Sequence, residues 1–150
     1  MSSDPSTVAE RLERIAAEFA ELAPRERLEV LLEYCDKLAP LPPEYQAQRD
    51  AGSHRVHECQ TPVFLWVDLT GMRVRISADV APEAPTVKGF VGLLVEAFQD
   101  APAAEVLAVE PNIVQRLGLS EALGMLRMRG LSAILHYIRA QVRRAIEPQA

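Results

Sequence analysis

The chain has 150 residues, a length that suits one folded domain with a core large enough to be stable without disulfides or metals. Its net charge of −5 argues against a general nucleic-acid surface, and no apolar run is long enough to cross a membrane. The N-terminus does not resemble a secretory signal, and two cysteines do not make a disulfide framework. We therefore expect a single cytoplasmic domain over residues 1–150, with free thiols.

The first predicted helix begins after residue 7. Thr7 and Glu10 have the spacing of a capping box, in which each side chain satisfies a free backbone amide of the first turn. Apolar residues then recur at steps of four, three and four. These residues are Val8, Leu12, Ile15 and Phe19. The spacing predicts an amphipathic helix, because residues at these steps share one helical face.

Pro24 is predicted to open a second helix, since its missing N–H has no helical partner in the first turn. This helix runs to about residue 38 and carries Cys35 on its apolar stripe. The prolines of residues 39–45 end it, because they bias the preceding backbone towards extended conformations. Residues 42–54 lack periodicity and are predicted to form a surface loop.

The hydrophobic period changes to two in residues 62–69 and 72–78, which predicts an antiparallel hairpin. Gly71, between the two segments, tolerates the positive φ that tight hairpin turns require. The covered face is expected to hold Val63, Leu65, Val67 and Leu69 from the first segment, and Met72, Val74, Ile76 and Ala78 from the second. Trp66 points to the other, partly wet face, and residues 55–57 are a candidate third strand.

The rest of the chain is predicted to be helical. Residues 86–99 are apolar around most of the helix and should be buried, with Gly89 at a close approach to a neighbour. Two short helices follow in residues 101–109 and 110–118. A long terminal helix carries an apolar stripe of Leu131, Ile134, Leu135, Ile138, Val142 and Ile146. The expected fold is α+β, with a small antiparallel sheet of about three strands flanked by N-terminal and C-terminal helices.

A metal or nucleotide cofactor is not expected. His54, His57 and Cys59 lie close together, but they lack a fourth ligand and the paired cysteines of a structural zinc site. The glycines follow no phosphate-binding pattern. Cys35 is expected to be a buried core residue, since free cysteine is among the most buried residue types, and no disulfide to Cys59 is expected.

Cys59 is predicted to lie in a polar loop at the entrance to a strand, where a rigid scaffold can present a reactive group. In an extended stretch, His57 would share its face, and a protonated imidazole would stabilise the nucleophilic thiolate. Glu58 would oppose this effect weakly from the other face. One cysteine near one histidine leaves two interpretations open, a reactive thiol and a buried structural thiol.

Four segments carry a family resemblance, in order along nearly the whole chain. They are LAPLPPE (38–44), VHECQTPVFL (56–65), APTVKGFVGLL (84–94) and LGLSEALGMLRMRGLSAIL (117–135). Together they resemble the SufE family of sulfur-acceptor proteins in iron–sulfur cluster assembly. The sequence departs from the family's usual pattern at Glu58, where glycine precedes the cysteine, and at Arg129, where asparagine is usual.

The resemblance implies that Cys59 accepts persulfide sulfur from a SufS-like cysteine desulfurase, stimulates that enzyme and delivers the sulfur to an iron–sulfur scaffold. The protein would then be a sulfur-transfer accessory protein more than a stand-alone enzyme, with no cofactor of its own. Gln60, Lys88 and Arg127 are candidates for the surface around the thiol. The apolar residues 63–65 are candidates for a shelter that protects the sulfur from water.

Three alternatives remain at this stage. Cys59 of a thiol peroxidase-like enzyme would use His57 as its base and turn over a small molecule without a protein partner. A rhodanese-type sulfurtransferase would replace the desulfurase as the sulfur donor of a carrier. In a pure binding module Cys59 would be incidental, so that its replacement would leave function intact.

Overall fold

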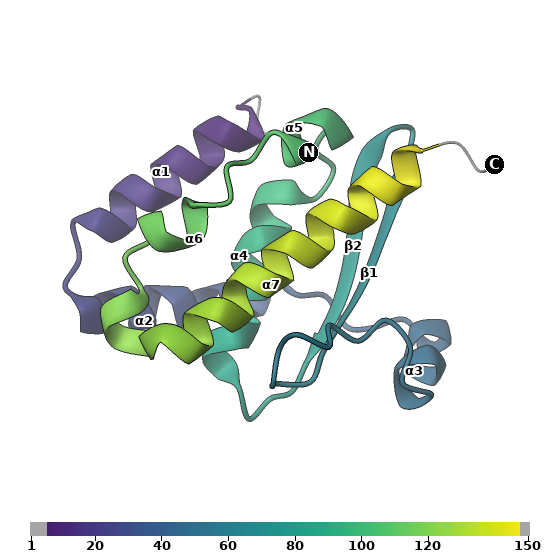
Figure 1. The fold of residues 1–150 in the computed structure, drawn as a ribbon, viewed down its shortest axis with the longest axis horizontal. Helices are drawn as coiled ribbons and strands as arrows, with labels where there is room; N and C mark the ends of the chain where they lie inside the picture. Colours follow the sequence, from purple (N-terminus) through teal and green to yellow (C-terminus); the bar gives the residue numbers. More distant parts are fainter. Residues whose placement is uncertain (1–5, 148–150) are drawn as a thin grey trace.

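The computed structural model describes residues 6–147 and has the predicted α+β architecture (Figure 1). A two-stranded antiparallel hairpin packs mainly against helices that follow it in the chain. The two ends of the predicted 1–150 domain lie outside the described residues, so the extent of the domain stays a prediction. Within residues 6–147, no helix has the length and apolar character needed to span a bilayer.

Helix α1, Val8–Ala20, begins with the predicted capping box. The backbone N–H of Glu10 donates to Thr7 Oγ1 at 3.1 Å, and the N–H of Thr7 donates to Glu10 Oε1 at 2.9 Å. The predicted apolar face is buried at Val8, Leu12 and Phe19. Helix α1 packs on three helices further along the chain, in residues 85–98, 103–107 and 113–116.

The second predicted helix ends earlier than expected. Helix α2 spans Pro24–Glu33, and a 3₁₀ turn, η1, spans Tyr34–Lys37. The change tightens the chain from 3.6 to 3.0 residues per turn, so the apolar stripe of α2 does not continue onto η1. Cys35 therefore lies in η1 and is only half-buried, and the prediction that it is a buried residue of the second helix is wrong.

The segment predicted as a surface loop contains a further helix, α3, Pro43–Asp50. Tertiary contacts hold it in place. The ring of Tyr45 stacks on Trp66 with the two ring centroids 4.8 Å apart, and Trp66 Nε1 donates to Gln48 Oε1 at 2.8 Å. Short helices depend on such packing more than on their own periodicity. Helix α3 covers Trp66, which is buried although its face of the sheet was expected to be partly wet.

The hairpin consists of β1, Val63–Thr70, and β2, Arg73–Val80, paired from Val63↔Val80 to Thr70↔Arg73. Gly71 and Met72 form the two-residue turn, both with positive φ, as the right-handed twist of a hairpin favours. Met72 is thus exposed in the turn and does not belong to the covered face. The candidate third strand is reduced to one isolated bridge between Arg55 and Phe64.

Helix α4, Pro85–Phe98, is the central buried helix that the sequence predicts. It packs against β2, α2 and η1. A Cβ atom at Gly89 would lie 2.3 Å from the carbonyl oxygen of Leu31, and one at Gly92 would lie 1.9 Å from that of Tyr34. Both glycines are therefore required where α4 crosses the backbone of α2 and η1.

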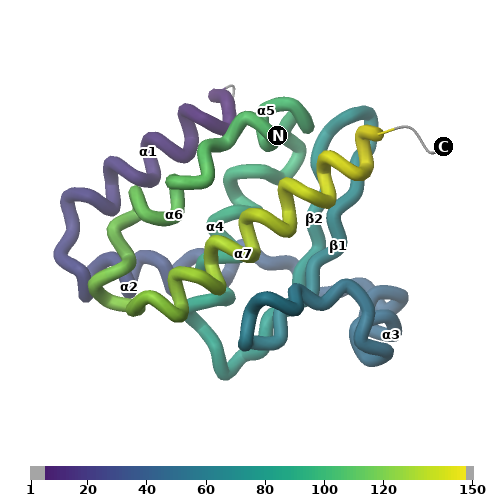
Figure 2. The backbone as a smooth tube through the Cα atoms, in the orientation of Figure 1, coloured from purple at the N-terminus to yellow at the C-terminus, as the bar shows by residue number. Residues whose placement is uncertain are grey.

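Three helices follow α4 within residues 6–147: α5, Ala103–Leu107, α6, Ile113–Arg116, and α7, Ser120–Ile146. Gly124 has φ 80° and ψ 167°, which breaks the first turn of α7 from the rest. Beyond this break α7 runs across α4 and the hairpin (Figure 2), in contact with α4 and β1. Its predicted stripe is buried from Leu131 to Val142, whereas Ile146 is exposed.

Candidate functional site

Cys59 lies in the loop between α3 and β1. The N–H of Val56 donates to the carbonyl of Val63 at 2.9 Å, and this pairing closes the loop at its base. The N–H of Cys59 donates to the carbonyl of Val56 at 3.2 Å, so residues 56–59 form a turn. The chain is therefore folded back at the position where an extended stretch was assumed.

The thiol of Cys59 points inward from this turn. Val56 and Cys59 are buried, with Cys59 only 4% exposed, whereas His57 and Glu58 at the corner of the turn are exposed. Of the two free thiols, Cys59 is thus more deeply buried than Cys35, which reverses the predicted order. Both cysteines are free thiols.

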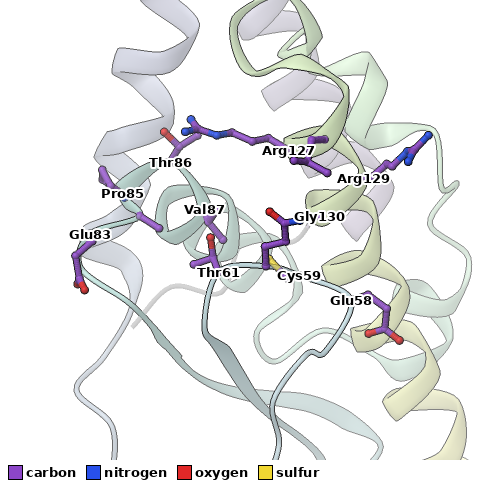
Figure 3. A pocket seen from close by; sticks show the side chains of 13 residues that line it. Glu58, Cys59, Thr61, Glu83, Pro85, Thr86, Val87, Arg127, Arg129 and Gly130 are labelled. Carbon is purple, nitrogen blue, oxygen red and sulfur yellow. The ribbon is translucent and has the colours of Figure 1, made fainter.

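A cavity of about 520 Å³ opens beside Cys59. Three segments far apart in the sequence line it: residues 58–61 of the loop, residues 83–87 leading into α4, and residues 126, 127, 129 and 130 of α7. Figure 3 shows the labelled side chains of all three segments gathered around the cavity. The first turn of α4 borders the cavity, and the positive end of a helix dipole favours an anion there.

The cavity brings together three of the predicted site residues, Cys59, Gln60 and Arg127. The side chain of Arg127 extends from α7 towards Thr86 at the start of α4, whereas the side chain of Arg129, which also lines the cavity, extends in the opposite direction (Figure 3). The side chain of Arg127 is exposed to solvent. It therefore places a solvated cation at the rim of the cavity.

Two predicted site residues, His57 and Lys88, do not line the cavity. His57 lies at the exposed corner of the turn, so the argument that it shares an extended face with Cys59 fails. Lys88 instead lies near the other cysteine, where its charge lowers the pKa of the Cys35 thiol. Burial is the larger effect and raises that pKa overall, and Cys35 Sγ donates to the carbonyl of Pro85 at 3.3 Å.

Glu58 replaces the family's glycine without left-handed backbone strain, because it is not among the residues with positive φ. The positive φ values in this loop occur at Gly52, with φ 87°, and at His54, with φ 65°. Glu58 points away from Cys59 in Figure 3. Its charge contributes to raising the pKa of Tyr137 on α7, an effect that is smaller than that of burial.

The loop histidines are engaged in different places. His54 stacks on Trp66, with the ring centroids 5.2 Å apart, and its Nδ1 lies 2.8 Å from Ser53 Oγ. Over residues 6–147, histidine, cysteine, aspartate and glutamate side chains form no group of three that could hold a metal ion. The described part of the chain therefore has a cavity beside the thiol of Cys59 and no cluster of side chains that could bind a metal ion.

Sequence reasoning missed most of the lining. The apolar residues 63–65 were expected to shelter the thiol, but they lie in β1 outside the cavity lining. Thr86, Val87, Leu126 and Gly130 take that place. Val87 and Gly130 belong to segments that carry the family resemblance, and this resemblance was the signal in the sequence that could have identified them. Their spacing along the chain does not indicate a shared cavity.

The sequence of the chain matches one protein-family model over most of its length. A family model described as SufE, Fe-S metabolism associated domain, matches residues 13–142. The chain belongs to the SufE family. SufE membership confirms the resemblance seen in the sequence and associates the protein with iron–sulfur metabolism.

Relatives extend the SufE similarity over nearly the full chain. An uncharacterized SufE-like protein of Mycobacterium tuberculosis is 35% identical over 142 residues, covering 94% of this chain and 97% of the relative. A SufE-like protein of Synechocystis, also uncharacterized, is 29% identical over 107 residues, covering 71% of this chain and 64% of the relative. The solution structure of a hypothetical protein from Thermus thermophilus is 42% identical, with a TM-score of 0.76, covering 91% of this chain and 96% of that chain.

Proposed function

We propose that this SufE-family protein is a sulfur carrier that accepts persulfide sulfur on Cys59 from a cysteine desulfurase and delivers it to an iron–sulfur cluster scaffold. One observation carries the proposal: the thiol of Cys59 is buried at the edge of a cavity of about 520 Å³, in a chain of this family. A cysteine that only filled core space would have no need of an adjacent cavity, because protein interiors are close-packed.

The transfer is an exchange between sulfur atoms. The thiolate of Cys59 attacks the outer sulfur of a persulfide on the desulfurase. A new S–S bond forms, the S–S bond of the donor breaks, and the donor cysteine leaves as a thiolate with the electron pair. No oxidant or reductant is consumed. Attack by a scaffold thiolate on the outer sulfur of the Cys59 persulfide repeats the same exchange in the next step.

The cavity supplies what a persulfide needs between the two exchanges. A buried sulfur is protected from water and oxidants, since oxidation of cysteine sulfur follows its exposure. The first turn of α4 and the nearby cation of Arg127 both favour a negative charge in the cavity, the form that a persulfide takes when it loses its proton. Burial also means that the loop has to move before either partner reaches the sulfur.

Exposed apolar side chains beside the cavity suit a docking partner. Met125 and Leu126 follow the break at Gly124 and are 76% and 61% exposed. Large apolar side chains grouped at a surface often mark a protein contact. We expect Met125→Ser to weaken stimulation of the desulfurase without loss of stability. Met72→Ser, at the exposed hairpin turn, is the matched control, and equal effects of the two changes would argue against docking beside the cavity.

Intact-mass spectrometry after incubation with a cysteine desulfurase and free cysteine tests the proposal. Wild type and Cys35→Ser should each gain the mass of one sulfur atom, and Cys59→Ser should gain none. Cys59→Ser is expected to bind the desulfurase still, because the hydroxyl removes the nucleophile and leaves the surface largely unchanged. Titration of desulfurase binding to each variant separates docking from transfer.

Two outcomes would contradict the carrier proposal. Stimulation of cysteine turnover by Cys59→Ser as strong as that by wild type would show that no relay through Cys59 occurs. Peroxide turnover by the isolated protein, without any partner, would instead favour the thiol peroxidase-like enzyme. Loading by thiosulfate with a rhodanese-type sulfurtransferase, and not by a desulfurase, would change the donor and keep the role of Cys59.

A further inference from the structure

Three helical glycines of this fold occupy very different surroundings. Gly89 and Gly92 of α4 have no room for a side chain, because a Cβ atom there would meet the backbone of α2 or η1. Gly130 of α7 is different. A Cβ atom at this position would have one atom within 4 Å among the described residues beyond its own chain neighbours and helix backbone, the Sγ of Cys59 at 3.5 Å.

Packing and backbone geometry therefore do not require glycine at position 130. A separation of 3.5 Å is ordinary van der Waals contact, and the backbone of Gly130 is helical, whereas the break in α7 lies at Gly124. Glycine is unfavourable inside a helix compared with alanine, so this position carries a stability cost that the thiol form of the protein does not need.

We propose that Gly130 keeps open the space that the outer sulfur of the Cys59 persulfide occupies. The inference deepens the proposed function and rests on Cys59 accepting sulfur. Cys59 and Gly130 both line the cavity, and Cys59 is only 4% exposed. An S–S bond extends about 2 Å beyond Sγ, which is enough to bring an outer sulfur into the place that a methyl group at position 130 would fill.

The consequence is selective. Alanine at position 130 would leave the thiol of Cys59 in normal contact and would crowd only the form that carries a second sulfur. Gly130 is then a positioning residue for the persulfide. Because this position has no side chain, there is room for the second sulfur on Cys59, and the fraction of Cys59 that retains sulfur depends on that room. Serine at this position, larger by one oxygen, should have a stronger effect than alanine.

The test uses Cys35→Ser as background and inorganic polysulfide as the sulfur source, so that no partner protein is needed. The thiolate of Cys59 attacks a sulfane sulfur, one S–S bond forms and one breaks, and a polysulfide shorter by one sulfur leaves with the electron pair. Intact mass gives the fraction of chains carrying sulfur. Gly130→Ala should lower the ratio of persulfide to thiol at Cys59 by about tenfold. The reason is that a methyl group and the outer sulfur would compete for the same space, and overpacking destabilises a protein.

The second readout separates positioning from a general structural role. The thiol form of Gly130→Ala should unfold at the same temperature as the Gly130 protein or higher, because alanine favours the helix. Its persulfide form should unfold at a lower temperature than its thiol form, a difference that the Gly130 protein should not show. Ser132→Ala, two residues along α7 and outside the cavity lining, is the matched control for helix propensity.

Each outcome bears on a defined claim. Equal sulfur retention by Gly130→Ala and the Gly130 protein would overturn the inference, because the outer sulfur would then lie elsewhere. Loading of the Gly130 protein by polysulfide but not by a desulfurase would contradict the proposed function and leave the comparison at position 130 valid. Failure of the Gly130 protein to load from either source would overturn both.

Discussion

At the scale of single residues, Arg127 and Arg129 make a matched pair, because α7 carries both and only Arg127 points across the cavity (Figure 3). Arg127→Gln is expected to slow sulfur transfer to Cys59 by up to about fivefold, since an exposed cation contributes at most about 1 kcal/mol to such an interaction. The effect should shrink with added salt, which screens exposed charges. Arg129→Gln should have a smaller effect, and equal losses would mean that only net charge matters.

The second thiol gives a prediction with a defined sign. Burial raises the pKa of Cys35 above its ordinary value of 9.0, and the charge of Lys88 partly offsets this rise. Lys88→Gln should raise that pKa further, so that alkylation of Cys35 requires a higher pH. The rate is measured against pH in Cys59→Ser. Lys37→Gln is the control, because Lys37 pairs with Glu96, and an identical shift in both variants would contradict the specific effect.

The same raised pKa links stability to pH. The folded state holds the thiol proton of Cys35 more tightly than the unfolded state, so this contribution is fully present below the ordinary pKa of 9.0. It is lost as pH rises through the higher folded-state pKa. Cys35→Ser should therefore lose less stability than wild type above about pH 9, measured by urea unfolding at several pH values.

The two cysteines also mark the limit of sequence reasoning at this scale. The helical period of the second predicted helix placed Cys35 on its apolar stripe, which would be right if α2 continued as an α-helix. The 3₁₀ turn begins at Tyr34, where the backbone is closely approached by Gly92, a residue far along the chain. The loop position of Cys59 was predicted correctly, but its burial depends on α7, which no local pattern reveals.

At the scale of elements, the crossing of α4 over η1 is the tightest packing point among the described glycines. Gly92→Ala should lower the free energy of unfolding by about 3 kcal/mol, because its Cβ would meet the rigid backbone of Tyr34. Gly130→Ala, whose Cβ would be in ordinary van der Waals contact with Cys59 Sγ, should instead leave it unchanged or raise it by up to about 1 kcal/mol. Urea unfolding of both variants measures the contrast, and equal effects would show that the crossing yields easily.

Elements with strong periodicity were predicted well. The capping box of α1, the alternation of the hairpin and the all-round apolar character of α4 each encode their structure locally. Helix α3 was missed because its sequence has no apolar stripe, and its stability comes from the stacking of Tyr45 on Trp66. The third strand was overpredicted, since one bridge at Arg55 suffices to close the loop.

At the scale of the whole molecule, the Cys59 loop is expected to open more easily than the rest of the fold. Few backbone hydrogen bonds hold residues 51–62 to the hairpin, and such segments open locally at a lower free energy than global unfolding. Alkylation of Cys59 in Cys35→Ser should therefore accelerate at urea concentrations below the unfolding transition. Acceleration that begins only with global unfolding would contradict the idea that a partner can draw the loop out.

The three segments of the cavity meet only when the fold is complete, which explains why the sequence predicted the thiol and not its surroundings. The loop, the start of α4 and the middle of α7 contribute to one site through tertiary packing. The family motifs identified the right segments, because three of the four contribute cavity residues. The distances between these segments could not be predicted from the sequence. Nor could the finding that His57 and Lys88 lie outside the cavity lining.

The docking of α1 has a consequence for synthesis on the ribosome. The N–H of Val8 donates to Glu105 at 2.9 Å, and Arg116 pairs with Glu13, contacts between residues 97 and 103 positions apart. The apolar face of α1 is therefore made long before the helices that cover it. A nascent chain exposes that face until α6 emerges, and exposed apolar surface attracts chaperones and promotes aggregation. Translation stalled before residue 113 should leave α1 uncovered and sensitive to protease, whereas release of the full chain should protect it.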